Sequence, residues 1–170
     1  MSYQVVRGTK DLFFSEVEKF TFIKEKAIKV CRQYGFSEAI TPIFEFANVF
    51  KSHLGETNDV VNKEMYTLLD RNGETLALRP EGTAPLVRML LSNKLTHELP
   101  LKFFYCGPMF RYERPQKGRQ RQFYQFGIEH FLACTPLSDA LTLLLAKQFL
   151  DSLHINEYSL EVNNLGTYEE

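Results

Sequence analysis

Residues 104–131 read FYCGPMFRYERPQKGRQRQFYQFGIEHF, and this stretch decides the fold. Two segments rich in aromatic and other β-forming residues flank a short basic loop, residues 114–120. Pro115 and Gly118 mark a turn within that loop. The pattern therefore predicts an antiparallel hairpin around which the rest of the chain is organised.

The two faces of this hairpin differ in chemistry. Successive side chains on a strand point to opposite faces, so Tyr124, Phe126 and Ile128 share one face, which we expect to join the core. Arg111 and Glu113 share a face on the outgoing segment. The other face of the returning segment carries Arg121, Phe123, Gln125, Gly127 and Glu129. We expect this polar face to be a binding surface.

Positive charge is concentrated at the hairpin tip. The whole chain has a formal net charge of −1, yet residues 111–121 contain four arginines and one lysine against one glutamate. A solvated basic turn is one interpretation. The other is an anionic partner, above all phosphate, which guanidinium groups bind in a bidentate manner. The recessed Phe123 and the acid Glu129 behind the turn favour the second interpretation.

A second informative stretch is RPEGTAP, residues 79–85. Thr83, with Pro85 just beyond it, is typical of a helix start. Glu81 and Thr83 then lie at a strand-to-helix junction, where a carboxylate and a hydroxyl suit an ammonium group, and Gly82 permits close backbone approach. The alternative, that these residues only cap the helix, explains Thr83 better than Glu81.

The remaining segments predict an α+β fold. Ser15 and Glu18 have the spacing of a capping box at the start of an amphipathic helix that ends at Gly35. Asn72-Gly73 indicates a second hairpin turn. Thr135-Pro136 predicts the start of another helix, and residues 158–162 alternate like a last strand.

Composition indicates one globular domain. A chain of 170 residues can bury roughly 70% of its unfolded surface. Its three cysteines, Cys31, Cys106 and Cys134, form no Cys-x-x-Cys pair, so we expect neither a disulfide framework nor a zinc site. The sequence has no apolar run long enough for a membrane span and no signal peptide, so we expect a cytoplasmic protein.

Residues 110–129, FRYERPQKGRQRQFYQFGIE, resemble the second signature motif of class II aminoacyl-tRNA synthetases in its histidyl-tRNA synthetase form. The likeness extends to RGTKD near the start, to residues 55–85 and to LEVNNLG near the end. It implies a fold with an antiparallel β-sheet flanked by helices, the class II catalytic core. Residues 1–170 would form the N-terminal portion of that domain, with motifs 1 and 2. Motif 3 and the anticodon-binding domain would lie outside it, leaving the chain alone inactive or nearly so.

The resemblance implies that ATP and histidine are the small substrates of a ligase. Arg111 would be the catalytic cation at the α-phosphate of ATP. Further ATP contacts would come from Glu113 at the adenine edge, Arg119 at the outer phosphates and the Phe123 ring against adenine. Mg²⁺ would be held by the ATP phosphates, and no metal-binding residues are expected.

The resemblance also implies the histidine pocket and the macromolecular partners. The histidine-binding residues would be Glu81, Gly82, Thr83, Gln125 and Glu129. The missing side chain of Gly127 would leave room for this small ligand. We expect Arg111, Phe123 and Glu129 to line a cleft shared with Glu81.

At the loop tip, Arg114, Gln116 and Lys117 would contact the acceptor end of tRNA(His), although they could equally just solvate the turn. A homodimer would form through motif 1 around Pro42.

Two other functions are compatible with the sequence. One is the synthetase-like regulatory subunit of ATP phosphoribosyltransferase, which is not a ligase and tends to depart from the family at Glu81-Gly82-Thr83 and at the basic loop. The other is a nucleic-acid-binding module that uses the basic hairpin for phosphates and its aromatic rings for stacking.

Overall fold

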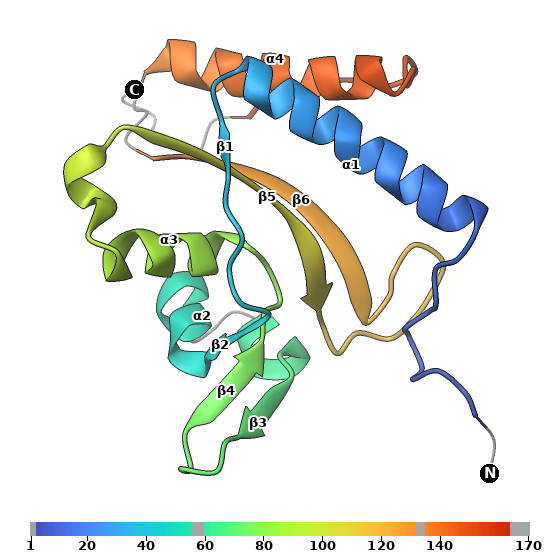
Figure 1. Cartoon of the computed structure of the whole chain (residues 1–170), viewed down its shortest axis with the longest axis vertical. Coiled ribbons are helices and arrows are strands. Elements are labelled where there is room, and N and C mark those ends of the chain that lie inside the picture. The colour runs from blue at the N-terminus through green and yellow to red at the C-terminus, as the bar shows by residue number, and fades with distance from the viewer. Residues whose placement is uncertain (1–2, 56–59, 132–134, 164–170) are drawn as a thin grey trace.

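The computed structural model describes residues 3–55, 60–131 and 135–163. In this part of the chain, two three-stranded sheets are surrounded by helices (Figure 1). The arrangement is α+β, as predicted.

Each element is short except for the central hairpin and two long helices. The helical segments are α1 (Ser15–Gln33), α2 (Ala47–Leu54), the π-helical turn η1 (Val60–Glu64), α3 (Thr83–Ser92), the 3₁₀ turn η2 (Leu95–Glu98) and α4 (Pro136–Ser152). The strands are β1 (Ser37–Glu38), β2 (Phe44–Phe46), β3 (Thr67–Leu69), β4 (Thr75–Leu78), β5 (Leu101–Phe110) and β6 (Gln122–Phe131).

Strands β5 and β6 form the predicted hairpin. They pair antiparallel over ten residues each, from Leu101 opposite Phe131 to Phe110 opposite Gln122. Strand β1 adds to the outer side of β5 in parallel orientation, so the sheet order is β1-β5-β6. The register fixes which residues share a face, because partners directly opposite each other point the same way.

One face of the hairpin packs against two helices, α1 and α4, which lie across it in Figure 1. Phe104, fully buried, contacts Val30 and Cys31 of α1 and Leu145 of α4. The even-numbered residues of β6, Phe126 and Ile128, pack against the same cluster. Phe126 and Ile128 thus lie on a core face, as the alternation predicted. Tyr124, expected on the same face, is instead 46% exposed and lies against the Phe20 ring of α1.

The opposite face is also partly covered. Tyr105 and Met109 of β5 pack with Leu86 of α3 and with Ala39. Phe123 lies at the edge of this cluster. The polar side chains of β6 therefore stand beside apolar ones, in a half-buried setting rather than on an open surface.

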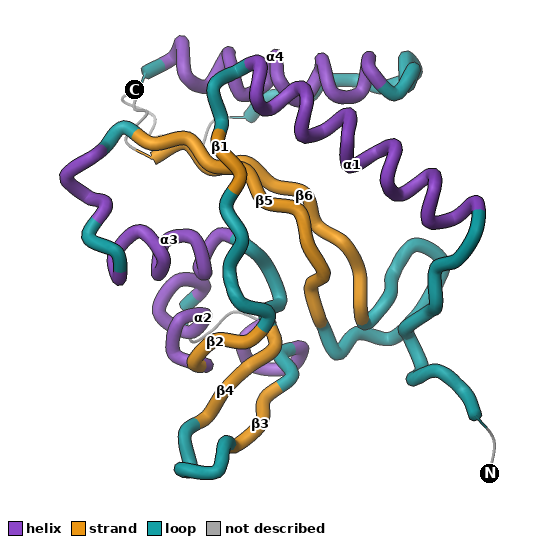
Figure 2. The backbone as a smooth tube through the Cα atoms, in the orientation of Figure 1, coloured by secondary structure: helices purple, strands orange, loops and turns teal. Residues whose placement is uncertain are grey.

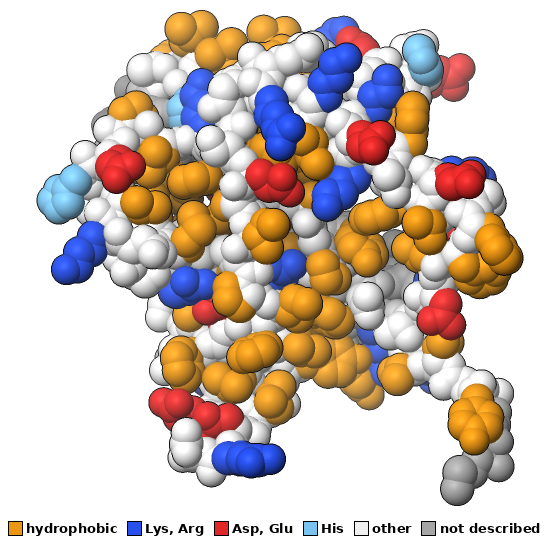
Figure 3. Space-filling view, in the orientation of Figure 1, with side chains coloured by type: hydrophobic (Ala, Val, Ile, Leu, Met, Phe, Trp, Pro, Cys, Tyr) orange, Lys and Arg blue, Asp and Glu red, His pale blue; other side chains and the backbone are white. Residues whose placement is uncertain are grey.

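The second sheet has the order β2-β4-β3 and packs through Ala77 against Phe50 of α2 and Ala84 of α3. Its outer side exposes large apolar residues, which gather around this sheet in the space-filling view (Figure 3). They are Phe44, Phe46 and Leu68, which the register places on one face, together with Ile40 and Ile43 of the segment before β2. A contiguous apolar surface of this kind indicates an interaction site.

Helix starts were predicted with mixed success. At α4, the Thr135 hydroxyl accepts a hydrogen bond from the Ser138 N–H and Pro136 is the first helical residue, as expected. At α1, the residue before the helix is Phe14, with a φ of 50° and no side-chain cap. Ser15 is already helical, so the capping-box prediction was wrong. Gly35, with a φ of +78°, follows the helix end as predicted.

The last strand was also predicted wrongly. Residues 158–162 form no regular secondary structure and are exposed. An alternating pattern needs a neighbouring strand to supply hydrogen bonds, and none pairs with it in the described chain.

Among the helices of the described chain, none combines the length and the apolar character that a membrane span needs.

Candidate functional site

The turn between β5 and β6 is held by backbone hydrogen bonds. The Arg111 N–H donates to the Arg121 carbonyl at 2.9 Å, which extends the strand pairing by one step. Gln116 and Arg119 pair across the tip, where Gly118 has a φ of +82° that other residues rarely adopt. The basic loop is therefore a closed extension of the hairpin.

The four residues predicted to bind ATP meet at one cavity of about 350 Å³. Arg111 and Glu113 follow the end of β5, Arg119 lies in the turn and Phe123 is near the start of β6. The lining residues are Arg111, Glu113, Gly118, Arg119, Gln120, Phe123 and Tyr124. The hairpin thus brings two cations, one acid and one aromatic ring to the same hollow.

Glu113 organises the charges of this cavity. Its Oε2 lies 3.1 Å from Nη1 of Arg119 and its Oε1 lies 4.0 Å from Nη1 of Arg111. The Arg111 Nε donates to the Pro80 carbonyl at 2.8 Å, and its guanidinium lies 5.2 Å from the centre of the Phe123 ring. One carboxylate between two guanidinium groups leaves a net positive site that suits an anion.

Arg121 does not join these residues. We expected it on the ligand-binding face, but its guanidinium stacks on the Tyr112 ring at 4.0 Å and its Nε donates to the Glu113 carbonyl. The backbone N–H of Arg121 donates to the Gly8 carbonyl at 2.7 Å. A Cβ at Gly8 would come within 2.7 Å of the Arg121 side chain. Arg121 therefore anchors the N-terminal segment, which runs beside the hairpin turn in Figure 2.

A second polar cluster lies where α3 begins. The Glu81 carboxylate accepts hydrogen bonds from the backbone N–H groups of Thr83 at 2.6 Å and Ala84 at 2.9 Å. The Thr83 hydroxyl donates to Oε1 of Glu129 at 2.6 Å. Gly82 occupies the cap position of α3, and the side chain that caps the first turn is that of Glu81, the residue that the capping alternative explained less well. Each carboxylate still has acceptor capacity, since its two oxygens offer about four lone-pair sites.

The environment of Glu129 favours its neutral form. Burial is the first cause that raises the pKa of this carboxyl above its ordinary value, and the nearby Glu81 raises it further. The hydrogen bond from Thr83 and the charge of His53 act in the opposite direction. A positively charged or hydrogen-bond-donating ligand beside Glu129 would stabilise its ionised form.

Gln125 stands between the cavity and this cluster. Its side-chain Oε1 is buried and has no hydrogen-bond partner in the described part of the chain. A buried acceptor without a donor costs free energy. This oxygen is therefore available to accept a hydrogen bond from a ligand.

Gly127 does not leave an open space for a ligand. Tyr105 lies directly opposite it in the sheet, and a Cβ at Gly127 would come within 2.7 Å of the Tyr105 ring. The tyrosine ring fills the room that we expected a small substrate to use. Its register position opposite Gly127 was the signal that could have identified Tyr105 from the sequence.

Arg79 is another residue that the sequence did not single out. It is buried, and its Nε and Nη1 donate to the carbonyls of Pro108 and Thr41 at 2.9 and 2.8 Å. A Cβ at the neighbouring Gly107 would collide with this guanidinium. Arg79 thus joins β5 to the segment around Pro42 and fixes the start of the RPEGT segment.

The four residues expected to line one cleft fall into two neighbouring groups. Arg111 and Phe123 line the cavity, whereas Glu81 and Glu129 are absent from its lining and belong to the second cluster. The two groups adjoin, because Arg111 is bonded to Pro80, the residue before Glu81. The site therefore consists of a cationic cavity next to an acidic cluster.

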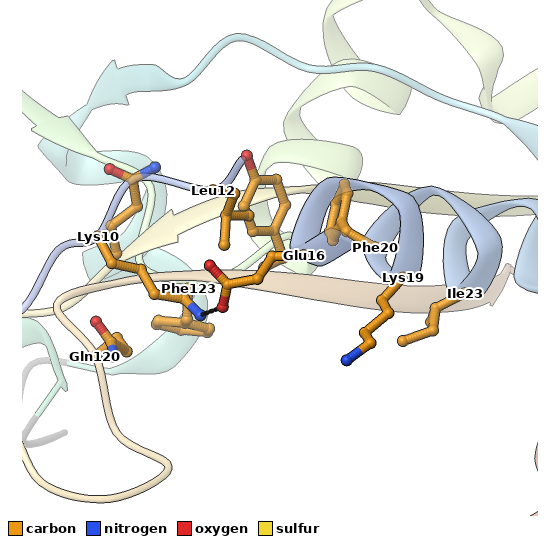
Figure 4. A pocket seen from close by; sticks show the side chains of 10 residues that line it. Lys10, Leu12, Glu16, Lys19, Phe20, Ile23, Gln120 and Phe123 are labelled. Carbon is orange, nitrogen blue, oxygen red and sulfur yellow. Dashed lines mark hydrogen bonds and ion pairs between the residues drawn. The ribbon is translucent and has the colours of Figure 1, made fainter. Parts of the chain in front are cut away.

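Phe123 also lines a second cavity on the side of α1, with a volume of about 370 Å³ (Figure 4). Lys10 and Glu16 form an ion pair of 3.0 Å at its mouth, and Leu12, Phe20 and Ile23 supply apolar walls. The two cavities share Gln120, Phe123 and Tyr124 as lining residues. They therefore adjoin at the Phe123 ring.

The loop residues Arg114, Gln116 and Lys117 are exposed at the hairpin tip. None of the three lines the cavity, so their side chains are available to a binding partner. Among the described residues, no group of three or more His, Cys, Asp and Glu side chains could hold a metal ion.

The central hairpin, with helices over one face and a cationic cavity at its turn, belongs to the α+β fold of class II aminoacyl-tRNA synthetases. A family model described as histidyl-tRNA synthetase matches residues 8–170. The histidine–tRNA ligase of Gluconobacter oxydans (strain 621H) is 52% identical over 164 residues, covering 96% of this chain and 40% of that protein. The chain therefore belongs to the histidyl-tRNA synthetase family.

Solved structures agree with this assignment. The apo histidyl-tRNA synthetase of S. aureus matches with a TM-score of 0.75 and 33% identity, covering 89% of this chain and 35% of that chain. A Bacillus halodurans protein described as an ATP phosphoribosyltransferase regulatory subunit/histidyl-tRNA synthetase matches with a TM-score of 0.79 at 23% identity, over 92% of this chain and 40% of that one. The second likeness shows a shared fold alone. The chain spans about two fifths of the length of the curated relatives it matches.

Proposed function

We propose that this chain is the part of a histidine–tRNA ligase that binds ATP and histidine. The whole enzyme would activate histidine to histidyl-adenylate and transfer it to tRNA(His). The observation that carries the proposal is the single cavity in which Arg111, Glu113, Arg119 and Phe123 meet.

Arg111 is the proposed catalytic residue. In the activation step a carboxylate oxygen of histidine forms a bond to the α-phosphorus of ATP, while the bond to the pyrophosphate oxygen breaks. Two anions must approach each other and negative charge builds on the phosphate oxygens, so a fixed cation contributes most of the stabilisation. The hydrogen bond of Arg111 to Pro80 pre-orients its guanidinium for this task.

The other cavity residues would hold the nucleotide. Arg119, exposed at the turn and paired with Glu113, would reach the outer phosphates, on which Mg²⁺ would be carried. The Phe123 ring offers a stacking surface for adenine. Glu113 would accept a hydrogen bond from the adenine amino group with the lone pairs that the arginines leave free.

The acidic cluster would hold histidine. Glu129 would accept a hydrogen bond from an imidazole N–H, and the unpartnered Oε1 of Gln125 would accept one from the α-ammonium group. Glu81 and Thr83 have remaining acceptor capacity for the same group, and Gly82 leaves the backbone accessible. A site with several buried acceptors rejects apolar amino acids strongly, because binding them would leave those acceptors unpaired.

The partners follow from the exposed parts of the fold. Arg114, Gln116 and Lys117 would contact the acceptor end of the tRNA from the hairpin tip. A homodimer would bury the apolar surface of the second sheet near Pro42, which includes Phe44 and Phe46. Residues 1–170 would be the N-terminal portion of the catalytic domain of a cytoplasmic enzyme, inactive or nearly so without motif 3.

The test is histidine-dependent ATP–pyrophosphate exchange by a full-length ligase whose first 170 residues are this chain. Replacing Arg111 with Ala should lower the exchange rate roughly a hundredfold or more, the effect typical of losing one charge-stabilising donor. Arg71→Ala is the matched control, since Arg71 is exposed on the β3–β4 turn. Absence of exchange in the folded wild-type enzyme would remove the proposal. Histidine binding without exchange would instead favour a regulatory subunit, and salt-sensitive RNA binding indifferent to histidine and ATP would favour a nucleic-acid-binding module.

A further inference from the structure

Arg79 is a buried cation that directly follows β4, with only 6% of its surface exposed. Its Nε donates to the Pro108 carbonyl of β5 at 2.9 Å. Its Nη1 bonds to the Thr41 carbonyl at 2.8 Å and lies 3.1 Å from the Thr41 hydroxyl and 3.4 Å from the Pro42 carbonyl. The fork of a guanidinium bonds two separate segments at once, and the single ammonium group of a lysine cannot reproduce that geometry.

Strand β5 leaves room for this guanidinium at Gly107. A Cβ at Gly107 would lie 2.3 Å from Nη2 of Arg79, so any side chain there would displace the charged group. The position of the Arg79 guanidinium is therefore set from two sides, by hydrogen bonds to neighbouring carbonyls and by the bare backbone of the strand.

The main chain beside this anchor holds Arg111. The Arg79 carbonyl accepts a hydrogen bond from the Phe110 N–H at 3.0 Å, and the next carbonyl, that of Pro80, accepts one from Nε of Arg111 at 2.8 Å. Pro80 is fully buried, and a proline ring fixes its own φ and restricts the preceding residue to extended conformations. Two successive carbonyls thus hold the backbone just before Arg111 and the Arg111 side chain itself.

We propose that Arg79 is a positioning residue for the activation step. Its guanidinium fixes the Arg79–Pro80 peptide between β5 and the segment around Pro42, and that peptide orients the Arg111 guanidinium in the ATP cavity. Arg79 is absent from the lining of this cavity, so it acts through Arg111 and does not touch the substrate. This inference rests on the proposed function, in which Arg111 stabilises charge at the α-phosphate of ATP.

A purely structural role of Arg79 makes a different prediction. An arginine that only holds two segments together would, when replaced, reduce activity by the same factor whether or not Arg111 is present. A residue that orients Arg111 has no effect on the rate once Arg111 is gone. A double-mutant cycle of the two arginines therefore separates the two roles.

The first variant is Arg79→Lys in the full-length ligase, assayed by histidine-dependent ATP–pyrophosphate exchange. Its kcat should fall about ten- to hundredfold, the effect of a misplaced catalytic group. The KM values should change far less than kcat, because the lost contact is made mainly in the transition state. In an Arg111→Ala background the same change should lower kcat by less than about twofold. Arg71→Lys, on the exposed β3–β4 turn, is the matched control and should leave the wild-type rate unchanged.

Gly107→Ala disturbs the same guanidinium without removing any of its donors. It should reproduce the fall in kcat, and lose this effect in the Arg111→Ala background, even where Arg79→Lys does not fold. A kcat within about twofold of wild type for both variants, or equal fold losses with and without Arg111, would overturn the inference. In either case a wild-type enzyme that exchanges pyrophosphate keeps the proposed function intact, whereas a wild type without exchange removes both.

Discussion

The two faces of the β5–β6 hairpin use the same strands for opposite purposes. On one face Phe104, Phe126 and Ile128 join an apolar cluster with α1 and α4. On the other, Gln125 and Glu129 stand beside Tyr105 with a buried acceptor that has no partner in the described chain. Because adjacent side chains of a strand point to opposite faces, neighbouring residues serve stability and chemistry separately. The covered face supplies the rigidity on which the polar face depends.

Truncating Phe104 should have the largest effect. Its side chain is fully buried at the centre of the covered face, so Phe104→Ala should lower the free energy of unfolding by about 3–5 kcal/mol. Urea denaturation of the chain measures it. Phe104→Leu, which leaves a smaller cavity, is the control and should lose clearly less. Equal, small losses for both variants would show that this face is not the core.

A methyl group at Gly127 tests the crowding on the polar face. Gly127→Ala should cost about 1–3 kcal/mol of unfolding free energy, typical of overpacking, because the new Cβ meets the Tyr105 ring. The same change in a Tyr105→Ala background should cost much less. A double-mutant cycle measures this coupling, and additive effects would contradict the contact.

Glu129→Gln should sharpen the contrast through pH. Because the pKa of Glu129 is higher in the folded chain than its ordinary value of 4.5, its ionisation makes folding less favourable as pH rises through that window. The variant should therefore be more stable than wild type at pH 7.5 and lose this advantage near pH 4. Denaturation curves at the two pH values check the sign, and an advantage that grows on acidification would refute it.

The smallest effect is expected at the hairpin tip. Lys117 is exposed and lies outside both clusters, so Lys117→Ala should change unfolding free energy by less than about 0.5 kcal/mol. Binding of tRNA by the full-length ligase should weaken, with a salt slope shallower by about one unit. Lys94→Ala, at an exposed position beyond α3, provides the control. An unchanged salt slope would mean that the tip merely solvates the turn.

Much of this arrangement could be predicted from local pattern. The alternation of residues 122–131 gave the hairpin and its core face, since period-2 hydrophobicity is encoded residue by residue. The helix start at Thr135-Pro136 followed from capping chemistry of the same local kind. At residues 158–162 the pattern misled, because a strand exists only where a neighbour pairs with it.

The polar cluster depended on contacts between distant residues. Thr83 is a residue type that often caps helices, but its hydroxyl donates a hydrogen bond to Glu129, 46 residues away. The Glu81 side chain caps α3 in its place. The missing side chain of Gly127 suggested room for a ligand, but the ring of Tyr105 on the paired strand fills that room. Alternation predicted that Arg121 would face the ligand, but its guanidinium stacks on the Tyr112 ring and its backbone N–H donates to Gly8. The residue types of the site were therefore foreseeable, whereas the pairing among them was decided by tertiary packing.

The central claim is tested most directly at two adjacent residues on opposite faces, Ile128 and Glu129. Histidine affinity of the full-length ligase and its unfolding free energy would be measured for Ile128→Ala and Glu129→Ala. Ile128→Ala should lose stability, by about 2–5 kcal/mol, and keep its affinity for histidine, whereas Glu129→Ala should lose that affinity and keep its stability. Two variants that lose both properties together, or an Ile128→Ala variant that loses affinity alone, would contradict the separation of the two faces.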